Sequence, residues 1–483
     1  MKEYKILSQK ELDEQMEYAS RVKDNIQLSG EMKYACVLTF GCQQNEADSE
    51  KIAGLCKSMG YEICKSAEDA SLVLVNTCAI REHAEKKALS IIGQFKHLKA
   101  KNPDMLIGVC GCMVTQEHRK EEIKHSYPYV DFVFGTSSLY RLPELVYQKT
   151  KAGKRIFCPE ENEYSVFEGV EPVRESNYRA WVSIMYGCNN FCTYCIVPYV
   201  RGRERSRRPE DIISEVKDLV SRGYKDITLL GQNVNSYGKD VTDMDGHVYD
   251  FADLVADIDK IEGDYYLHFM TSHPKDASFK LIDVMASSKH VARQFHLPLQ
   301  SGSDRILGLM NRHYDTERYL SCVEYMREKI PDITLSTDII VGFPGESEED
   351  FEATLNILDK VGFDMIYSFI YSPRKGTPAA QMENQIPEKE KSERFDRLLA
   401  LQNQIALEKN KPLEGKVLRI LCDGESKNNS EVYSGRTQGN KIVMFDKDIA
   451  KKGEFVELKI DRADTFALYG SLPEKPTDNT FNG

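Results

Sequence analysis

The sequence predicts an α/β protein of several domains, and three observations lead to this fold class. Apolar runs alternate with helical patterns over residues 31–149 and again over residues 179–408, which is typical of βαβ units with parallel sheets. Residues 409–475 carry only short β-like runs separated by glycine-containing turns, which is typical of a small antiparallel β-barrel. A chain of 483 residues is long enough for about three domains of ordinary size.

The first domain is expected to be a flavodoxin-like βαβ sheet over residues 31–149. Its strand candidates are the apolar runs Tyr34–Phe40, Ser71–Val75 and Met105–Val109, with helical patterns between them. Residues 1–30 are polar and strongly charged. We expect them to form a helical or loosely ordered extension without chemistry of its own.

The central region contains six apolar strand candidates separated by helical patterns such as Pro209–Arg222 and Thr316–Lys329. Because parallel strands with right-handed helical crossovers close progressively, six such units predict a partial (β/α)6 barrel. Residues 150–178 have little periodicity and are interpreted as a linker. The strand candidates are Ala180–Tyr186, Asp226–Leu230, Tyr265–Met270, Gln294–Leu299, Ile333–Val341 and Met365–Tyr371.

The last region carries five short β-like runs, followed by a tail at 476–483. Between Glu408 and Asp464 there are twelve basic and eleven acidic residues, whereas the whole chain has a net charge of −12. This local enrichment favours contact with RNA, and the alternative is a plain β module. The runs are Val417–Cys422, Glu431–Tyr433, Lys441–Phe445, Phe455–Ile460 and Phe466–Tyr469.

Composition narrows the class of protein further. The acidic net charge argues against indiscriminate nucleic-acid binding, which relies on a basic surface. No apolar run is long enough to span a bilayer, and Met1 to Gln15 lacks an apolar signal core, so we expect a cytoplasmic protein without a membrane partner. In a reducing cytosol, thirteen cysteines are expected to be metal ligands or buried thiols.

Cys188, Cys192 and Cys195 form a C-x-x-x-C-x-x-C run directly after an apolar stretch. A four-iron, four-sulfur cluster takes one thiolate per iron, so three cysteines leave one iron open. Zinc fits poorly, because structural zinc sites need four ligands and no histidine lies within the run. The alternative is a chance group of cysteines or a disulfide.

A second set of three cysteines, Cys42, Cys78 and Cys112, is spaced by 36 and 34 residues, about the length of a βα unit. Each follows an apolar strand candidate, and parallel strands share one carboxyl edge, where open α/β sheets place their ligands. The three cysteines could therefore hold another cluster. Cys110 is the competing candidate, since it would share a face with Cys112 in a strand. The glycine that precedes both Cys42 and Cys112 favours Cys112, so the remaining cysteines are expected to be non-ligands: Cys36, Cys56, Cys64, Cys110, Cys158, Cys322 and Cys422.

The loop at Cys188–Cys195 resembles the cluster-binding loop of radical S-adenosylmethionine (SAM) enzymes. Together with the set Cys42, Cys78 and Cys112, this loop makes the chain resemble the methylthiotransferases from about Tyr34 to Tyr469. This resemblance implies a methylthiotransferase domain at 31–149, a radical-SAM partial barrel at 179–408 and a TRAM-like RNA-binding barrel at 409–475. Five motifs are similar to the branch that acts on isopentenylated adenosine in tRNA: Thr39–Asn45, Asn76–Glu82, Gly231–Asn235, Thr271–Pro274 and His296–Ser303.

The resemblance also implies a reaction, in which sulfur is inserted at C2 of N6-isopentenyladenosine at tRNA position 37 and then carries a methyl group. Such an unactivated C–H bond requires cofactor chemistry. The resemblance implies two [4Fe-4S] clusters, two SAM molecules per turnover, an external electron donor such as flavodoxin, and a sulfur source. The implied macromolecular partner is the tRNA anticodon stem-loop. No catalytic residue beyond the clusters is expected.

Several further residues are candidates for SAM or RNA contacts. Tyr194 is expected near the adenine of SAM, with packing on the barrel rim as the alternative. Gln232 and Asn233 follow a strand end and could reach SAM or the base. Asp338 and Gly342 lie in a strand that ends in a glycine turn, and an ordinary turn without a ligand is the alternative.

The arginine-rich run that follows the cysteine loop is expected to bind anions, because arginine forks suit carboxylates and phosphates. Arg203 is assigned to SAM, and the rest to the RNA backbone. The alternative is a solvated basic run. His273, His296 and His313 are expected to be structural or hydrogen-bonding residues. The arginines assigned to RNA are Arg201, Arg205, Arg207 and Arg208.

Three other functions remain open from the sequence. The first is the same chemistry on threonylcarbamoyl-adenosine of tRNA. The second is a non-catalytic iron–sulfur scaffold or electron carrier that binds RNA. The third is a radical-SAM methylase with a single working cluster.

Overall fold

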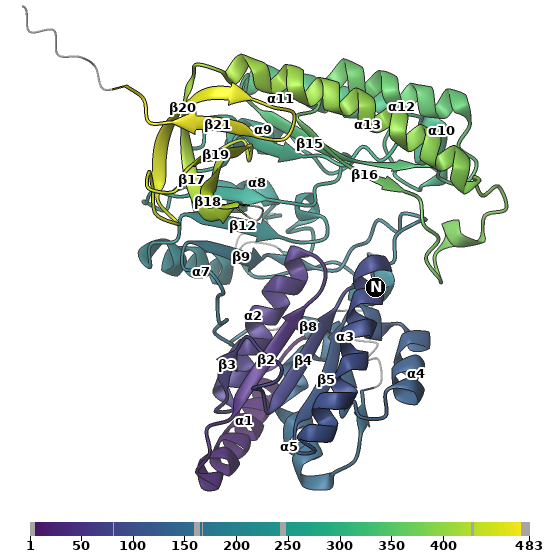
Figure 1. The fold of residues 1–483 in the computed structure, drawn as a ribbon. Helices are drawn as coiled ribbons and strands as arrows, with labels where there is room; N and C mark the ends of the chain where they lie inside the picture. Colours follow the sequence, from purple (N-terminus) through teal and green to yellow (C-terminus); the bar gives the residue numbers. More distant parts are fainter. Residues whose placement is uncertain are drawn as a thin grey trace, which may run out of the picture.

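The computed structural model describes residues 5–80, 82–158, 165–166, 168–241, 248–426 and 429–474. An N-terminal α/β unit lies below a half-open barrel of strands and helices, and a small β-barrel lies at the side of the larger one (Figure 1). The expected tail at 476–483 and the first four residues of the expected extension lie outside the described residues. In the part that is described, no helix combines the length and the apolar character that crossing a membrane requires.

The N-terminal unit is built on six parallel strands in the order β3-β2-β4-β5-β6-β7. The predicted βαβ sheet is therefore confirmed. Its last strand, β7, lies in the stretch interpreted as a linker. Ile156 of this strand pairs with Phe132 of β6, so the sheet extends into that stretch. The strands are β2 (Tyr34–Thr39), β3 (Glu62–Cys64), β4 (Leu72–Thr77), β5 (Leu106–Gly111), β6 (Phe132–Phe134) and β7 (Ile156–Phe157). The helices are α1 (Gln9–Ser29), α2 (Gln43–Ser58), α3 (Glu82–Lys101), α4 (Glu117–Ser126) and α5 (Leu142–Ala152).

The charged N-terminal extension is a regular helix, α1, that belongs to this unit. Ser8 and Glu11 form a capping box at its start, and Gly30 ends it in the left-handed region. Ala19 and Val22 are buried in the core shared with α2 and α5. The short strands β1 (Lys5–Ile6) and β8 (Ser165–Val166) also pair with each other.

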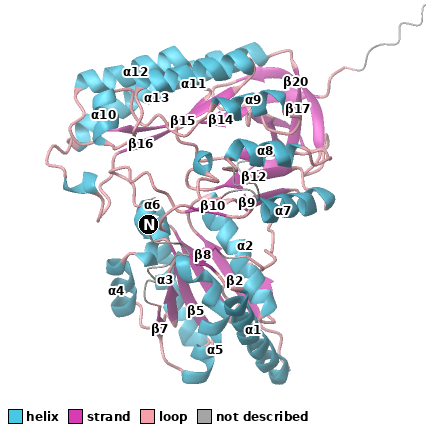
Figure 2. Cartoon of the chain, turned by 180° about the vertical axis from the view of Figure 1, so that it is seen from behind, coloured by secondary structure: helices cyan, strands magenta, loops and turns pink. Residues whose placement is uncertain are grey.

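The central region has all six predicted strands, which form two three-stranded parallel sheets joined by a bridge between Leu267 and Val291. The partial barrel is therefore confirmed, with β9 and β16 as its open edges (Figure 2). Its strands are β9 (Arg179–Ser183), β12 (Asp226–Leu230), β13 (Tyr266–Phe269), β14 (Gln294–His296), β15 (Thr334–Val341) and β16 (Met365–Ile370). Its helices are α7 (Pro209–Ser221), α8 (Phe251–Asp259), α9 (Phe279–Ser287), α10 (Asp304–Leu309), α11 (Thr316–Lys329), α12 (Glu348–Val361) and α13 (Glu388–Asn410).

Alternation along the strands separates the core of this barrel from its interior. On β15, Leu335, Ile339 and Val341 are buried in the core beneath the covering helices. Ser336 and Asp338 point the other way, toward the barrel interior. The interior surface therefore carries polar groups, and His296 lies against both of these.

The small barrel contains the five expected strands and is closed, in the order β17-β18-β19-β21-β20. One pair, β19 and β21, is parallel, so the barrel is not wholly antiparallel as predicted. Arg179 of β9 contacts Asp423, and Lys441 contacts Asp364 just before β16. The small barrel therefore docks at the amino ends of the larger barrel's strands. Its strands are β17 (Val417–Ser426), β18 (Asn429–Thr437), β19 (Ile442–Asp446), β20 (Phe455–Ala463) and β21 (Leu468–Ser471).

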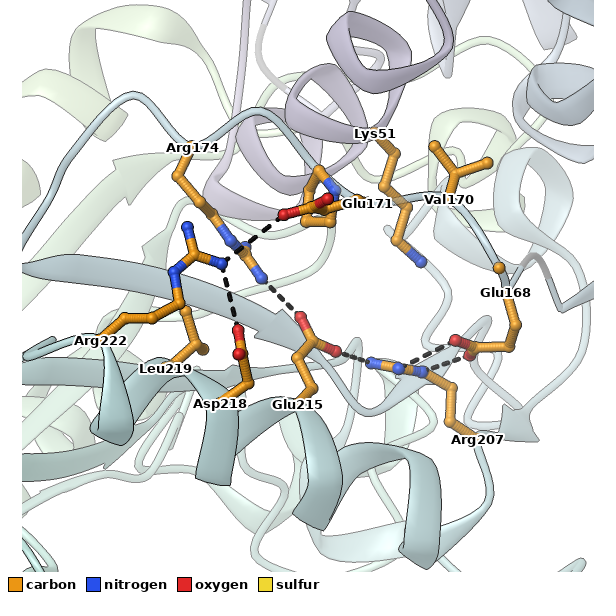
Figure 3. Close-up of a pocket in the computed structure, with 12 residues that line it drawn as sticks. Lys51, Glu168, Val170, Glu171, Arg174, Arg207, Glu215, Asp218, Leu219 and Arg222 are labelled. Atoms are coloured by element: carbon orange, nitrogen blue, oxygen red, sulfur yellow. Dashed lines mark hydrogen bonds and ion pairs between the residues drawn. The ribbon is translucent and has the colours of Figure 1, made fainter. Parts of the chain in front are cut away.

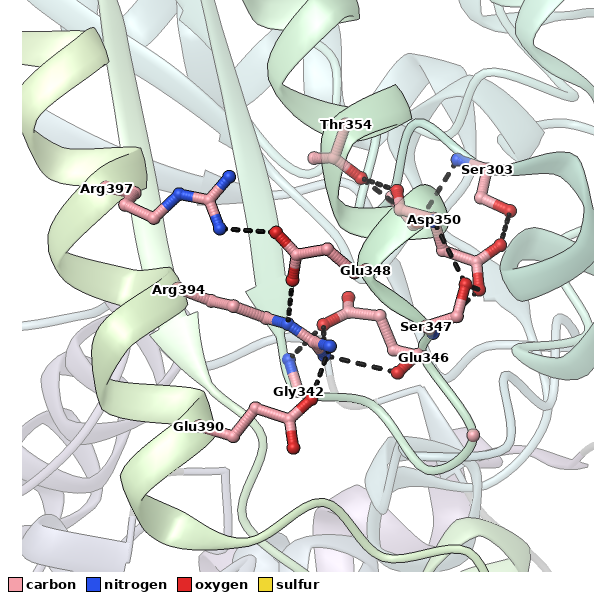
Figure 4. Close-up of polar contacts among 12 residues, drawn as sticks. Ser303, Gly342, Glu346, Ser347, Glu348, Asp350, Thr354, Glu390, Arg394 and Arg397 are labelled. Carbon is pink, nitrogen blue, oxygen red and sulfur yellow. Dashed lines mark hydrogen bonds and ion pairs between the residues drawn. The ribbon is translucent and has the colours of Figure 1, made fainter.

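The turn after β15 is held by an ionic cluster with α13 (Figure 4). Arg394 faces three carboxylates, those of Glu346, Glu348 and Glu390. Glu346 is the most buried of them and also accepts a hydrogen bond from the Gly342 amide at 2.9 Å. Burial raises the pKa of Glu346 to about 7 against the opposing effects of the amide and of Arg394.

This raised pKa predicts a pH-dependent stability. The stabilisation is fully present below pH 4.5, the ordinary pKa, and is lost as pH rises through about 7. The unfolding free energy of the wild type should therefore fall between those values relative to Glu346→Gln, by at most roughly 3 kcal/mol. Urea denaturation across this range measures the difference.

Glu348→Gln is the matched control in the same cluster. The pKa of Glu348 is lowered by hydrogen bonds from Arg397, so this variant should keep the wild-type slope. Parallel stability curves for the wild type and Glu346→Gln would contradict the assignment.

Candidate functional site

Cys42, Cys78 and Cys112 lie together at the carboxyl ends of β2, β4 and β5, as their spacing indicated. Asn45, in the first turn of α2, joins two of them, because its Oδ1 lies 4.0 Å from Cys42 Sγ and 3.9 Å from Cys112 Sγ. The Asn45 side-chain amide donates to the carbonyls of Phe40 and Thr77. The asparagine therefore ties the ends of the strands to one another.

Glycine allows the three strand ends to approach this closely. Gly41 has φ 128°, and a Cβ there would lie 2.5 Å from the Cβ of Cys78. Gly111 has φ 94° and turns the chain between Cys110 and Cys112. Cys110 is fully buried in the core, so the two cysteines do not share a face as continuous strand geometry would require.

Arg201 reaches the set Cys42, Cys78 and Cys112 from the barrel side. It ends the short helix α6 (Val197–Arg201), and its Nε donates to Cys112 Sγ at 3.2 Å. Its Nη2 donates to Asn45 Oδ1 at 2.7 Å and to Asp48 Oδ2 at 2.8 Å. Burial raises the pKa of the Cys112 thiol to about 12, and the guanidinium offsets part of this rise.

Cys188, Cys192 and Cys195 lie on one loop beyond the strand β10 (Met185–Tyr186), which pairs with β11 (Arg205–Ser206). The loop is fixed at several points by main-chain contacts. The Cys188 amide donates to Gly202 O at 3.1 Å, and the Thr193 amide to Met310 O at 3.0 Å. This anchoring holds three thiols on one short, ordered segment.

A second buried arginine, Arg312, contacts this loop. Arg312 follows α10, and its Nη1 donates to Cys192 Sγ at 3.4 Å. Its other contacts are neutral oxygens, those of Pro298 and Tyr314. Burial raises the pKa of Cys188 to about 12, and Arg312 again opposes the rise. Each cysteine set thus has one buried guanidinium that donates to one of its sulfurs.

The two sets lie on either side of one interface, because Gln232 and Gln44 connect the loop to α2. The Gln232 side chain accepts from the Gly187 amide and lies 3.5 Å from the Gln44 oxygen. Gln44 in turn donates to Ser183 Oγ at 2.8 Å, at the end of β9. The helix that starts next to Cys42 therefore also touches the strand that leads to Cys188.

The other residues assigned to SAM lie in different parts of this region. Tyr194 packs on the barrel rim, with its ring 6.5 Å from that of Phe343. Asp338 faces the barrel interior, 3.6 Å from His296 Nε2. Gly342 lies in the turn of Figure 4, where a Cβ would lie 2.3 Å from Lys391 Cγ. Arg203 is exposed and covers the ring of Phe191.

Three of the four arginines assigned to RNA are buried inside the protein. Arg201, Arg205 and Arg207 are each 4% exposed, and only Arg208 lies on the surface. Arg207 pairs with Glu168 and Glu215 (Figure 3). The run holds the loop and the two units together, which its composition did not indicate.

A cavity of about 430 Å³ lies at the seam between α2, α7 and the connecting segment, and its lining residues are drawn in Figure 3. Its arginines are paired with its carboxylates: Arg174 contacts Glu215, and Arg222 contacts Asp218. None of the lining residues is a cysteine. The cavity is therefore separate from both cysteine sets.

Three buried polar atoms near the cysteine loop have no hydrogen-bond partner within the described part of the chain: Asn233 Oδ1, Ser272 Oγ and His273 Nε2. They follow β12 and β13 at the carboxyl end of the barrel, where Thr271 also adopts a positive φ of 66°. Strain and orphan polar atoms at one place indicate a polar ligand site. Sequence reasoning named Asn233 there but treated His273 as structural and overlooked Ser272.

The residues present fit iron–sulfur clusters better than single metal ions. No group of three or more His, Cys, Asp or Glu side chains in the described ranges is arranged to hold one metal ion. In a cubane each thiolate binds a different iron, so its cysteines stand further apart than the ligands of one ion. Burial, and then the neighbouring thiols, raise the pKa of Cys112 in one set and of Cys195 in the other, and a cationic cluster would relieve this rise.

Comparison with known proteins identifies three segments of the chain. Residues 182–358 match the radical SAM superfamily, and residues 411–472 match the TRAM domain. Residues 34–135 match a family described as uncharacterized protein family UPF0004. A radical S-adenosylmethionine methyltransferase, TsrM from Kitasatospora setae, is a structural neighbour with TM-score 0.53 and 15% identity, covering 72% of this chain and 77% of that one. This likeness concerns the fold.

Relatives of much higher identity cover nearly the whole chain. A protein from Acetivibrio thermocellus is 49% identical over 95% of this chain and 94% of its own length. One from Caldicellulosiruptor saccharolyticus is 50% identical over 92% and 93%, respectively. Both are named tRNA-2-methylthio-N(6)-dimethylallyladenosine synthase. The chain therefore belongs to the radical SAM superfamily and, within it, to the family of these synthases.

Proposed function

We propose that this protein is a tRNA methylthiotransferase that converts N6-isopentenyladenosine at position 37 to 2-methylthio-N6-isopentenyladenosine. The observation that carries the proposal is the pair of three-cysteine sets on either side of one interface. The names of the relatives support this substrate over threonylcarbamoyl-adenosine. We retain the cytoplasmic location expected from the sequence.

Cys188, Cys192 and Cys195 would hold one [4Fe-4S] cluster, and Cys42, Cys78 and Cys112 a second. When bound, the first supplies the one-electron chemistry that activates SAM, and the second supplies a site for the sulfur to be transferred. The protein's own part is to position these groups. Gln232 holds the base of the loop, and Asn45 holds two of the strand-end cysteines.

Polar groups at the carboxyl end of the barrel would bind SAM. Asn233, Ser272 and His273 offer buried atoms without protein partners within the described residues, and Lys275 holds the loop through Asn190 Oδ1 at 2.8 Å. Asp338 and His296 would orient a polar ligand from the opposite sheet. Two SAM molecules per turnover, an external one-electron donor of the flavodoxin class and a separate sulfur source complete the proposal.

The tRNA would contact the small barrel and the exposed arginines beside the cysteine loop, Arg203 and Arg208. The small barrel docks at the amino ends of the strands, whereas the cysteines lie beyond the carboxyl ends. The eight residues of β15 span roughly 25 Å. A partner that touches both ends must be at least this long, which suits an anticodon stem-loop better than a free nucleoside.

A direct test is to incubate the reconstituted protein with SAM, a reductant and isopentenylated tRNA. Mass spectrometry of the nucleosides should show the 2-methylthio product on this tRNA and none on threonylcarbamoylated tRNA. Release of 5′-deoxyadenosine separates an enzyme from an iron–sulfur scaffold that only binds RNA. Product on the threonylcarbamoylated tRNA alone would replace the proposal with that alternative.

Replacement of Cys42, Cys78 and Cys112 by Ala tests the second cluster. We expect the iron content to fall from about eight to about four per chain, because one complete ligand set is lost. The matched control replaces Cys36, Cys56 and Cys110, which are buried and expected to be non-ligands, and should retain about eight irons after correction for folded protein. Equal iron content in the two triple variants would refute the N-terminal cluster.

The backbone of the cysteine loop gives a further prediction. Gly187 has φ 76°, and a Cβ there would lie 2.0 Å from Arg203 O. Gly187→Ala should therefore disorder the loop and remove the iron of one cluster. Gly223→Ala is the control, since Gly223 has φ 86° but a Cβ added there would meet no atom within 4 Å. Full iron loading of Gly187→Ala would show that the loop does not depend on this turn.

A further inference from the structure

The two buried arginines, Arg201 and Arg312, differ in whether a carboxylate compensates their charge. Arg201 is paired with a carboxylate, that of Asp48, at 2.8 Å. Arg312 has no carboxylate within ion-pair distance among the described residues, and its donors meet Pro298 O, the Tyr314 hydroxyl and Cys192 Sγ. One cysteine set thus faces a neutral ion pair, and the other faces an uncompensated cation.

The arginines and Asp48 are buried, so their charges act strongly on the nearby sulfurs. Arg201 and Arg312 are 4% and 5% exposed, and Asp48 is 4% exposed. Charges interact far more strongly in such surroundings than in water. The N–H groups also point at the sulfurs themselves, 3.2 Å from Cys112 and 3.4 Å from Cys192.

The other charges near the cysteine loop do not cancel Arg312. Glu204 and Asp276 are the nearby acids, and Glu204 accepts from the Asn189 amide at 3.1 Å. Lys275 donates to Asn190 on the same loop and also lies 3.7 Å from Asp276, and Arg203 lies over Phe191 of the loop. Among the described residues neither acid pairs with Arg312, whose charge is therefore not cancelled.

We propose that Arg312 makes the Cys188 site the easier of the two to reduce, and that the Arg201–Asp48 pair withholds this effect from the Cys42 site. Net charge and hydrogen bonds to the sulfurs are established controls of iron–sulfur potentials. One electron from an external one-electron reductant enters a cluster without any bond being made or broken. The added negative charge is stabilised by a nearby cation, so the electron is directed to the site with the unpaired arginine.

This inference rests on the two clusters of the proposed function. Each arginine would act on its cluster indirectly, through the cysteine sulfur to which it donates. Its test is an EPR-monitored redox titration of reconstituted full-length protein without tRNA. Each site is measured alone, in a chain whose other three ligand cysteines are replaced by Ala. Dithionite-reduced protein that shows no EPR signal in either background would count against the proposed function itself.

Arg312→Met should lower the midpoint potential of the Cys188 site, whereas Arg312→Lys should stay closer to the wild type. Asp48→Asn should raise the potential of the Cys42 site, because it leaves Arg201 unpaired there. The double variant Arg201→Met with Asp48→Asn should return toward the wild-type value, since its net charge is again neutral. None of these substitutions should move the potential of the other site.

The inference is overturned if Arg312→Met loads iron normally and keeps its potential, or if Asp48→Asn lowers the potential of the Cys42 site. Should Arg312→Met fail to load iron, Asp48→Asn alone decides, because it changes the charge without removing a contact to a cysteine. Product formation by the wild type, measured separately, shows whether the proposed function stands when the potentials do not move.

Discussion

A single buried cation, the guanidinium of Arg201, connects the two halves of this site. It arises from the barrel, six residues after Cys195, and ends among Asn45, Asp48 and Cys112 of the N-terminal unit. Removing one partner of such a buried pair costs roughly 3–5 kcal/mol, because the remaining charge is left without compensation. The relative placement of the two cysteine sets depends on this contact and on the glutamine contacts beside it.

The rest of the architecture follows from how strands end. In the N-terminal sheet, glycines and an asparagine gather three strand ends, and in the barrel a pinned loop presents three cysteines beyond one strand. Both arrangements use the carboxyl edge of parallel strands, where ligands of open α/β sheets bind. The small barrel occupies the opposite, amino end, which leaves the cysteine edges facing each other across the interface.

Sequence reasoning predicted the fold well where a local pattern determines the structure. The six barrel strands and the five strands of the small barrel are runs whose apolar or alternating residues are visible in a short window. It missed β3, β6 and β7 of the N-terminal sheet, because two or three residues are too few to show a period. It also missed the parallel pairing of β19 and β21, which depends on closure of the barrel.

The site was predicted only in part, for a related reason. The cysteine spacing was informative because ligand number is a chemical constraint. An arginine run, in contrast, has the same composition whether it faces solvent or fills an interface, so Arg201, Arg205 and Arg207 were assigned to RNA. The contact of Arg312 with Cys192 could not be predicted from the sequence, since it joins positions 120 residues apart.

The most direct test of the central claim is iron anomalous scattering from crystals of the anaerobically reconstituted protein. The account predicts two iron positions, one bounded by Cys42, Cys78 and Cys112 and one by the cysteine loop, with Arg201 beside the first. Iron at only one set, or at neither, would contradict it.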